Sequence, residues 1–522
     1  MPNKVDKVIV TNVGALKTKY GVGFAAIQKA INDLITTDNT RGLQSRLIAL
    51  DDKSAMASVS GTAVTKPADP RQNKAAVDAI YKALAPDYIL LLGASDIISH
   101  QDLKNPMYNK DGDDDPIAWG DVPYACEAPY SPQPHDFVGP TRVVGRLPDI
   151  VGVGKPDYLV TLLNNAANYK AVTPSDFTSY FAVSAAVWQK STDLSITNTF
   201  GNTTSLGDVP PKNYKWTAAQ LKPRPHFFNC HGAALDSRFF GQPASGAQQY
   251  PVAFNAAWAD GKVPAGAVVA AECCYGGQLF DPAKNGFKVG EPGICNIYLK
   301  NGGWGFFGST TIAYGPSEGN GQADLICQFF LQRVMAGASL GRAALEARQK
   351  FVATATPPDP SDIKTLAQYN LYGDPSLTPV DMPQTSAPTN TKAVAMKVAQ
   401  RSDRADRRRV LFRHGISLEE HTPIPRRGGK TRPAILNALR KKAREFGIEP
   451  SEVLAFAVRH HARPKAMPKA LAAEKSLATA YHVLFGKRPE RKRDEPNIVK
   501  LVALIGKEVD GELVSVSKIH SR

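Results

Sequence analysis

Short apolar runs alternate with amphipathic stretches along the chain before Gln384, and this alternation restricts the fold more than any other feature. Lys7–Thr11 (KVIVT), Asp87–Leu92 (DYILLL) and Val268–Ala271 (VVAA) are mainly apolar on both faces and too short for helices. Gln72–Leu84 and Leu340–Phe351 instead repeat apolar residues at helical spacing. Strands that are apolar on both faces are typical of parallel sheets covered by helices on both sides. The pattern predicts an α/β fold, a three-layer α-β-α sandwich with a mainly parallel sheet.

The same pattern predicts the individual elements of the sandwich. The expected strands are Lys7–Thr11, Arg46–Leu50, Asp87–Leu92, Arg142–Arg146, Phe181–Val187, His226–Asn229, Val268–Ala271 and Trp304–Gly308. The expected helices are Gly21–Leu34, Gln72–Leu84, Tyr158–Tyr169, Ala323–Met335 and Leu340–Phe351. In parallel sheets ligand sites lie beyond the carboxyl ends of the strands. Residues that follow these runs are therefore the first candidates for function.

Charge separates the end of the chain from the rest. The net charge is +15, yet the segment from Gln384 onward holds 30 Lys and Arg against 14 Asp and Glu, a net of +16. The stretch of residues 381–391 is rich in Pro, Thr and Ser and is predicted to be a linker. We therefore expect an N-terminal α/β subdomain of residues 1–170, a second subdomain of residues 171–380 and a basic C-terminal domain of residues 392–522.

The basic domain is predicted to be mostly α-helical. Its Arg-rich and Ala-rich stretches show helical spacing of apolar residues, while the tail has the alternation of a strand. The expected helices are Lys392–Arg409, Arg432–Phe446, Pro450–His461, Lys469–Phe485 and Ile498–Ile505, followed by a strand at Glu512–Ile519.

Apolar runs and cysteines restrict the setting of the protein. No run approaches the ~20 residues of a membrane span, and the first ten residues, MPNKVDKVIV, lack the apolar core of a signal peptide. We therefore expect a cytoplasmic protein without membrane contact. Six cysteines in 522 residues form neither a disulfide framework nor a zinc-ligand spacing. Cys126, Cys295 and Cys327 are predicted to be buried apolar thiols.

Two motifs join an apolar strand to a reactive side chain and a glycine. His226–Gly232 (HFFNCHG) ends in His231 and Gly232, and Gly266–Gly277 (GAVVAAECCYGG) ends in two cysteines and a glycine turn. A thiol at a strand end can attack a carbonyl while a nearby imidazole handles its proton and glycine amides hold the oxyanion. A parallel sheet brings both strand ends to one rim. Each motif alone is more often structural, but their order favours a cysteine nucleophile with a histidine.

This order of motifs resembles the caspase-like cysteine peptidases, most closely the gingipain type. Tyr88–Gly93 (YILLLG), Arg142–Pro148 (RVVGRLP) and Gly373–Leu377 (GDPSL) are similar to further elements of the gingipain type and follow in the same order. The resemblance covers roughly residues 5 to 380 and leaves out the basic domain. It implies a caspase/gingipain-like sandwich in which residues 171–380 are the catalytic subdomain. It also implies a cysteine endopeptidase that acts on proteins or peptides through an acyl-enzyme and requires no cofactor for its chemistry.

The resemblance assigns His231 as the catalytic histidine and the amide of Gly232 as an oxyanion donor. The nucleophile is one of two neighbouring cysteines, Cys273 or Cys274. Metacaspases often carry two adjacent cysteines, of which the second is the nucleophile, and Cys274 also fits the Cys-x-Gly pattern of caspases. Strand alternation lets only one of the two thiols face the rim. These patterns favour Cys274, and Cys230 is predicted to point into the sheet.

The substrate pocket is left open by the sequence. Gingipains pair the histidine with an acid on the preceding strand, whereas Tyr180–Trp188 contains none, so the histidine can be without such a partner, as in caspases. Two charged residues follow that strand, and both are candidates for substrate binding. Lys190 would favour an acidic residue before the scissile bond, and Asp193 a basic one.

An acid-rich loop, Asn109–Asp115 (NKDGDDD), has two interpretations. Its alternating oxygens could hold calcium through Asp111 and Asp113, and gingipain-like enzymes often bind structural calcium. The loop lacks the downstream glutamate of an EF-hand, which favours a solvated turn. Both interpretations stay open.

The basic segment suggests a partner and an alternative function. Arg404–Arg413, Arg426–Lys430 and Lys487–Arg493 are positive clusters that could bind nucleic acid or an acidic regulatory protein. The alternative to a peptidase is an inactive peptidase-like scaffold that carries such a binding domain. If the pocket accepts arginine, Gln400–Arg409 is also a candidate site of self-cleavage.

Overall fold

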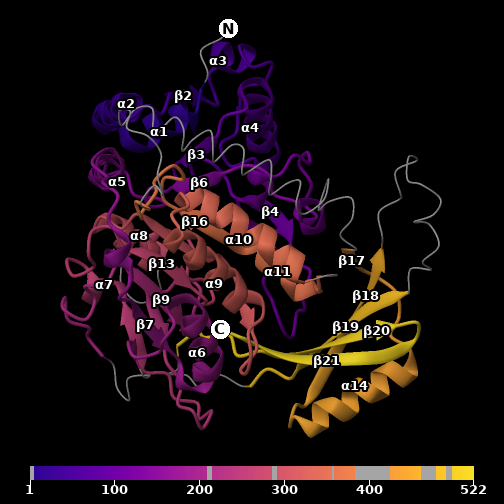
Figure 1. Ribbon diagram of the computed structural model, residues 1–522. Coiled ribbons are helices and arrows are strands. Elements are labelled where there is room, and N and C mark those ends of the chain that lie inside the picture. The colour runs from indigo at the N-terminus through magenta and orange to yellow at the C-terminus, as the bar shows by residue number, and fades with distance from the viewer. Residues whose placement is uncertain are drawn as a thin grey trace.

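A computed structural model describes residues 5–207, 214–284, 291–355, 358–382, 424–459, 478–489 and 496–522. A ten-stranded sheet forms the centre of the molecule, in the order β2-β1-β3-β6-β16-β14-β13-β9-β7-β8 (Figure 1). All neighbouring strands are parallel except β14 and β16. The strands are β1 (Lys7–Thr11), β2 (Ser45–Ala49), β3 (Tyr88–Leu92), β6 (Val144–Leu147), β7 (Phe181–Ser184), β8 (Leu206–Gly207), β9 (Pro225–Asn229), β13 (Val268–Ala271), β14 (Gly305–Ser309) and β16 (Tyr369–Tyr372). The predicted parallel sheet is confirmed.

Helices cover both faces of this sheet. They are α1 (Val13–Tyr20), α2 (Phe24–Thr40), α3 (Lys53–Ala57), α4 (Pro70–Leu84), α5 (Asp157–Ala167), α6 (Gln189–Phe200), α7 (Ala256–Ala259), α8 (Ile294–Lys300), α9 (Gln322–Met335), α10 (Leu340–Thr354) and α11 (Pro360–Gln368). Alternate residues of β13 divide the core, because Val269 and Ala271 pack with α2, α5 and α8, while Val268 and Ala270 pack with α6, α9 and α10. The three-layer α-β-α sandwich is therefore confirmed.

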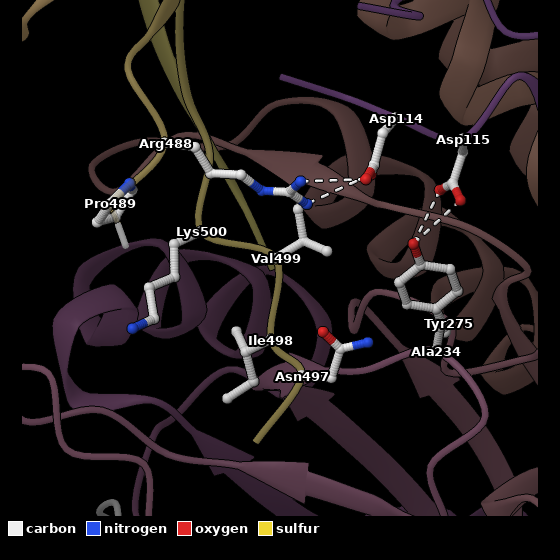
Figure 2. A pocket seen from close by; sticks show the side chains of 10 residues that line it. All are labelled: Asp114, Asp115, Ala234, Tyr275, Arg488, Pro489, Asn497, Ile498, Val499 and Lys500. Carbon is white, nitrogen blue, oxygen red and sulfur yellow. Dashed lines mark hydrogen bonds and ion pairs between the residues drawn. The ribbon is translucent and has the colours of Figure 1, made fainter. Parts of the chain in front are cut away.

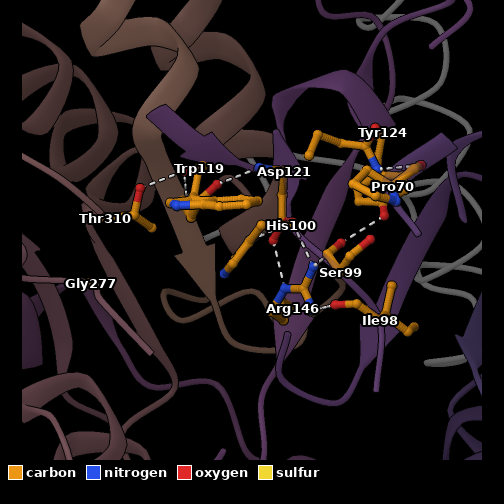
Figure 3. A network of polar contacts seen from close by, with 12 residues as sticks. Pro70, Ile98, Ser99, His100, Trp119, Asp121, Tyr124, Arg146, Gly277 and Thr310 are labelled. Atoms are coloured by element: carbon orange, nitrogen blue, oxygen red, sulfur yellow. Dashed lines mark hydrogen bonds and ion pairs between the residues drawn. The ribbon is translucent and has the colours of Figure 1, made fainter. Parts of the chain in front are cut away.

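A buried arginine ties the loops at one rim of the sheet to the strands (Figure 3). Arg146 at the end of β6 donates to both carboxylate oxygens of Asp121 at 2.7 and 2.6 Å and to the carbonyls of Gly93 and Ile98. Burial opposes the charged form of Asp121, but the charge of Arg146 holds the pKa of that carboxyl well below its usual range. Nearby, the Thr310 hydroxyl donates to the Trp119 carbonyl. The network fixes the loop that follows β14, which forms part of the site described below.

Beyond the large sheet, the C-terminal residues form a second, antiparallel sheet in the order β15-β21-β20-β19-β18-β17. Its strands are β15 (Tyr314–Gly315), β17 (Ile424–Arg427), β18 (Pro450–Arg459), β19 (Thr479–Gly486), β20 (Val502–Val509) and β21 (Glu512–Ser521), and the described residues of this part also form the helix α14 (Pro433–Glu445). β15 belongs to the loop after β14, so the large body supplies one edge of this sheet. In Figure 1 the yellow strand β21 runs from the C-terminal unit toward the body.

The prediction that the C-terminal domain is mostly helical is wrong for its described residues. The helix at Arg432–Phe446 and the strand at Glu512–Ile519 are confirmed as α14 and β21, but the described residues of Pro450–His461, Lys469–Phe485 and Ile498–Ile505 contribute to the strands β18, β19 and β20 instead. In β18 the side chains of Leu454 and Phe456 are buried at a spacing of two residues, which is the strand period. The many alanines and charges around them imitate a helical pattern. The predicted helix Lys392–Arg409 lies outside the described residues.

The two faces of the C-terminal sheet are covered differently. On one face, Leu484 and Leu504 pack against Ile435 and Leu439 of α14. On the other face, side chains such as Val483 share a buried cluster with residues of the large body. The sheet is therefore packed onto the body through an apolar core.

Within the described part of the chain, no helix combines the length and the apolar character that crossing a membrane requires.

Candidate active site at the sheet rim

Two neighbouring strands bring the histidine and cysteine motifs together. β9 and β13 are parallel neighbours, with Phe228 opposite Ala271, so both motifs continue from the same rim. The backbones then touch, because a Cβ atom on Gly232 would lie 1.7 Å from the carbonyl oxygen of Cys274. No side chain fits at this position, and glycine is required there for space. The structure thus joins the His231–Gly232 and Cys273–Cys274 segments as the motif order predicts.

The two adjacent cysteines have different surroundings. Cys273 is fully buried in the apolar cluster that also contains Cys230. Cys274 faces the opposite side, where its Sγ accepts a hydrogen bond from the amide of Ala313 at 3.3 Å. Its exposed fraction is 1% in this structure. Cys274 is therefore the thiol that faces the loop after β14, while Cys273 and Cys230 belong to the core.

The residue after Cys274 has an unusual backbone conformation. Tyr275 has a φ of +55°, in the left-handed region that residues with side chains rarely adopt. Its hydroxyl donates to both carboxylate oxygens of Asp115, at 3.1 and 3.0 Å. Its amide donates to the carbonyl of Thr311 at 3.0 Å. These bonds hold the sharp turn by which β13 ends, and strained backbone of this kind is concentrated at functional sites.

His231 has a polar partner that the sequence did not indicate. Its Nε2 lies 2.8 Å from Oε1 of Gln242, whose own amide nitrogen donates to the carbonyl of Gly246 at 2.9 Å. Because the Gln242 oxygen must accept, Nε2 of His231 carries the hydrogen and Nδ1 keeps its lone pair. Nδ1 is buried and has no hydrogen-bond partner among the described residues. The imidazole is thus oriented with one basic nitrogen unused.

Both reactive groups are neutral in this arrangement. Burial lowers the pKa of His231 to about 4, against the raising effect of the Gln242 bond, and Arg522 and Lys500 add to the lowering. Burial also raises the pKa of the Cys274 thiol to about 12. The site therefore contains a thiol and an imidazole rather than a thiolate and an imidazolium.

Two backbone amides at the site converge on one oxygen atom. The amides of Gly232 and Cys274 both point at the carbonyl oxygen of Arg522, at 3.4 and 3.2 Å. Arg522 is the last residue of the sequence and directly follows β21. A pair of N–H groups directed at one oxygen is the arrangement that stabilises the oxyanion of acyl transfer. The carbonyl group of Arg522 therefore lies beside the histidine and cysteine segments.

A cavity of about 480 Å³ opens next to this site (Figure 2). Ala234 and Tyr275, which follow the histidine and cysteine motifs, line it on one side, and Asn497–Lys500 line it on the other. An ion pair closes one end, with Arg488 donating to both carboxylate oxygens of Asp114 at 3.1 and 3.3 Å. The acid-rich loop thus borders the site and contacts the C-terminal unit.

The residues predicted to bind substrate or metal are not among those that line this cavity. Lys190 is exposed and pairs with Glu318 at 2.6 Å, and Asp193 is half-buried on α6. Asp111 is exposed, whereas Asp113 is buried, pairs with the Lys364 ammonium and accepts from Tyr314. Among the described residues no group of three or more His, Cys, Asp or Glu side chains could hold a metal ion. Calcium at this loop stays a prediction.

Three further side chains reach the site from distant segments of the chain. Gln242 follows β11 (Arg238–Phe240), which pairs with β10 (His231–Gly232). Asp324 comes from the first turn of α9, and Arg522 from the end of the chain. No local motif marks any of them, because only the tertiary arrangement brings them to the rim. The glycines around Pro316–Gly321 were the one available signal of a turn at the site.

Known proteins show little similarity to this chain. No protein-family model matches the chain, and no curated protein sequence is similar to it. A solved structure described as "Structure of Protease" matches 100% of this chain and 98% of its own, with 11% sequence identity and a TM-score of 0.46. At this level the similarity concerns the course of the chain and says nothing about the site.

Proposed function

We propose that the protein is a cysteine endopeptidase of the caspase-like type, with Cys274 as nucleophile and His231 as general base. One observation carries the proposal: the amides of Gly232 and Cys274 converge on one backbone oxygen of Arg522, and Gly232 directly follows a histidine with an unused basic nitrogen. This is the arrangement that acyl transfer to a thiol requires. The backbone geometry of the site thus supports the function that the resemblance of the motifs implies.

The chemistry follows from these groups. Nδ1 of His231 takes the thiol proton while Sγ of Cys274 forms a bond to the carbonyl carbon of the substrate. The oxyanion is held by the amides of Gly232 and Cys274. The C–N bond then breaks, and the imidazolium gives its proton to the leaving amine, which leaves an acyl-enzyme. Water next gives a proton to His231 as its oxygen attacks the thioester, and the acid product and the thiol are released.

The test compares three single variants on a library of fluorogenic peptides. Cys274→Ala and His231→Ala should each abolish cleavage, because each removes a reacting group. Cys273→Ala is the matched control, since it removes the neighbouring thiol, which lies in the core. Full activity in Cys274→Ala, or complete loss in a folded Cys273→Ala, would contradict the assignment.

A binding function is the second candidate, and the exposed face of α14 favours it. This face carries Arg440, Lys441, Lys442 and Arg444, of which Lys442 pairs with Glu445. A basic helical face of this kind is suited to a phosphate backbone or an acidic protein. On this view the sandwich is an inactive scaffold. It predicts no cleavage of any peptide and binding to polyanions that weakens steeply with salt.

A further inference from the structure

The Arg522 side chain enters a closed pocket beside the candidate site. Its side chain is 0% exposed, and Nη2 donates to Oδ1 of Asp324 at 2.8 Å, to the Pro316 carbonyl at 2.7 Å and to the Ser191 hydroxyl at 3.2 Å. The guanidinium also lies over the Trp188 ring, 4.6 Å from its centroid. A carboxylate at the end of an aromatic-walled pocket is suited to an arginine side chain.

A glycine makes room for this side chain. A Cβ atom on Gly315 would lie 2.3 Å from Nη2 and 2.6 Å from Nε of Arg522. Gly315 belongs to β15, the strand along which β21 runs. The glycine is thus required for space where the guanidinium passes, and any larger residue would fill the pocket.

A second carboxyl group lies at the end of the pocket. Burial first and the charge of Asp324 second raise the pKa of Glu272 well above its usual range, so Glu272 is the protonated member of the two carboxyl groups. Burial also raises the pKa of Asp324, but the charge of Arg522 and the Gly321 amide, which donates at 3.3 Å, favour the ionised form of this carboxyl. One negative charge is therefore available for one cation.

The backbone of the C-terminal segment is held as an added strand. β21 pairs antiparallel with β15, with Ser521 opposite Tyr314 and His520 opposite Gly315. The Arg522 amide donates to the Ala313 carbonyl at 3.0 Å, while the Arg522 carbonyl is held by the two converging amides. Strand addition to a sheet edge with one side chain in a pocket is a common mode of peptide recognition.

We propose that Asp324, Ser191, Trp188 and Gly315 form the pocket for an arginine before the scissile bond, and that the C-terminal strand of the same chain is its built-in competitor. The inference rests on the proposed peptidase function, whose substrates it narrows to peptides with arginine at this position. Asp324 holds the cation, Gly315 admits it, and β15 aligns the peptide backbone. Arg522 occupies each of these places, so an added substrate must displace it.

The pocket is tested first by binding, which does not depend on catalysis. Agmatine, which is arginine without its carboxylate, is added to full-length wild type, Arg522→Ala and the Arg522→Ala/Asp324→Asn double variant. Agmatine should raise the Tm of Arg522→Ala and leave the other two unchanged. N-Carbamoylputrescine, in which a neutral urea replaces the guanidinium group, should have no effect. Equal shifts in all three proteins, or equal shifts with both compounds, would overturn the pocket.

Cleavage of peptides that differ only at one residue then tests specificity. Arginine peptides should be cleaved with a kcat/KM on the order of 100-fold above their glutamine analogues, and Asp324→Asn should lose a similar factor. Asp260→Asn, which alters a surface carboxylate paired with Lys300, should not change the rate. Arg522→Ala should cleave faster than wild type, and Ser515→Ala, exposed on β21, should match wild type. Equal rates for Arg522→Ala and wild type would contradict the competitor.

The two experiments separate the two claims. Agmatine binding without cleavage of any peptide would retain the pocket and overturn the peptidase function. Cleavage without a preference for arginine, together with no agmatine binding, would retain the peptidase function and overturn the pocket.

Discussion

Arg146–Asp121 and Arg522–Asp324 are both buried ion pairs between an arginine and an aspartate, and they differ in how many nitrogens of the arginine have a hydrogen-bond partner. Arg146 uses Nε, Nη1 and Nη2, with bonds to Asp121 and to carbonyl groups of the same rim. Arg522 bonds through Nη2, while its Nε and Nη1 are buried and have no hydrogen-bond partner among the described residues.

This difference distinguishes an arginine that stabilises the fold from an arginine that occupies a binding pocket. A buried donor without a partner costs free energy, so native cores rarely keep one. The fully bonded Arg146 belongs to the permanent framework of the sheet. Arg522 instead occupies a pocket that holds it with fewer bonds than its groups could make, as expected for a ligand that is exchanged. The following predictions test this distinction between Arg146 and Arg522.

The largest effect is expected for the framework pair. Arg146→Ala leaves Asp121 as an unpaired buried charge and should lower the free energy of unfolding by about 3–5 kcal/mol. Arg522→Ala should cost clearly less, because Glu272 can share its proton with Asp324. Urea unfolding followed by circular dichroism measures both. Equal losses of stability would remove the distinction between framework and ligand.

A smaller effect, confined to activity, is expected for Gly315→Ala. The added methyl group would occupy the space of the guanidinium, 2.3 Å from Nη2 of Arg522. Cleavage of arginine peptides should fall by about 10- to 100-fold in kcat/KM, which corresponds to about 1–3 kcal/mol. Steady-state kinetics checks this, with the Tm of the variant as control for folding. Unchanged kinetics would place the arginine elsewhere.

The protonated carboxyl of the pocket predicts a dependence of stability on pH. The folded-state pKa of Glu272 is raised above its usual value of about 4.5 by burial first and by Asp324 second. The folded protein therefore binds a proton that the unfolded chain has lost, and its stability falls as pH rises above about 4.5, by up to about 1.4 kcal/mol per pH unit.

Glu272→Gln keeps the shape and removes this titration. The Tm of the variant relative to wild type should rise between pH 5 and pH 8, as differential scanning calorimetry can measure. Asp121→Asn is the control, because the lowered pKa of Asp121 keeps this aspartate charged throughout the range, so the Tm difference between this variant and wild type should stay constant from pH 5 to pH 8. A constant Tm difference for Glu272→Gln across this range would mean that Glu272 is ionised in the pocket.

The proposed arginine pocket also predicts slow cleavage of the chain within the predicted self-cleavage segment. Gln400–Arg409 lies outside the described residues and contains five of the arginines that the proposed pocket would accept. Arg522→Ala should therefore accumulate cuts in this segment over long incubation, and wild type should do so more slowly. Intact-mass spectrometry compares both with Cys274→Ala, which should remain whole. Identical masses in all three would exclude self-cleavage there.

Much of the large body could be predicted from sequence, because strands apolar on both faces and helices with one apolar face have distinct periods. Val268–Ala271 and Leu340–Phe351 show the two cases, and both elements form near the expected residues. The C-terminal unit could not be predicted in this way, because its strands mix alanine, charged residues and apolar residues. In Pro450–Arg459 only the burial of alternate side chains reveals the strand.

The candidate site divides in the same way. The proximity of His231, Gly232 and Cys274 follows from two strand ends in a parallel sheet, so it could be predicted. The pocket could not, because Asp324 and Arg522 are 198 residues apart and meet through an antiparallel strand pair that no motif marks. On α6, Ser191 contacts Arg522, and this residue lies between Lys190 and Asp193 in the sequence. Substrate binding by Lys190 or Asp193 stays a prediction.

Covalent labelling tests directly whether Cys274 is the nucleophile of a cysteine peptidase with an arginine pocket. A biotinylated arginyl acyloxymethyl ketone is added to Arg522→Ala, in which the competing side chain is absent, and the modified residue is identified by peptide mass spectrometry. The adduct should be on Cys274, should be absent in His231→Ala and should form more slowly in Asp324→Asn. An adduct on Cys273, or none on a folded Arg522→Ala protein, would contradict a cysteine peptidase built on Cys274 and an arginine pocket.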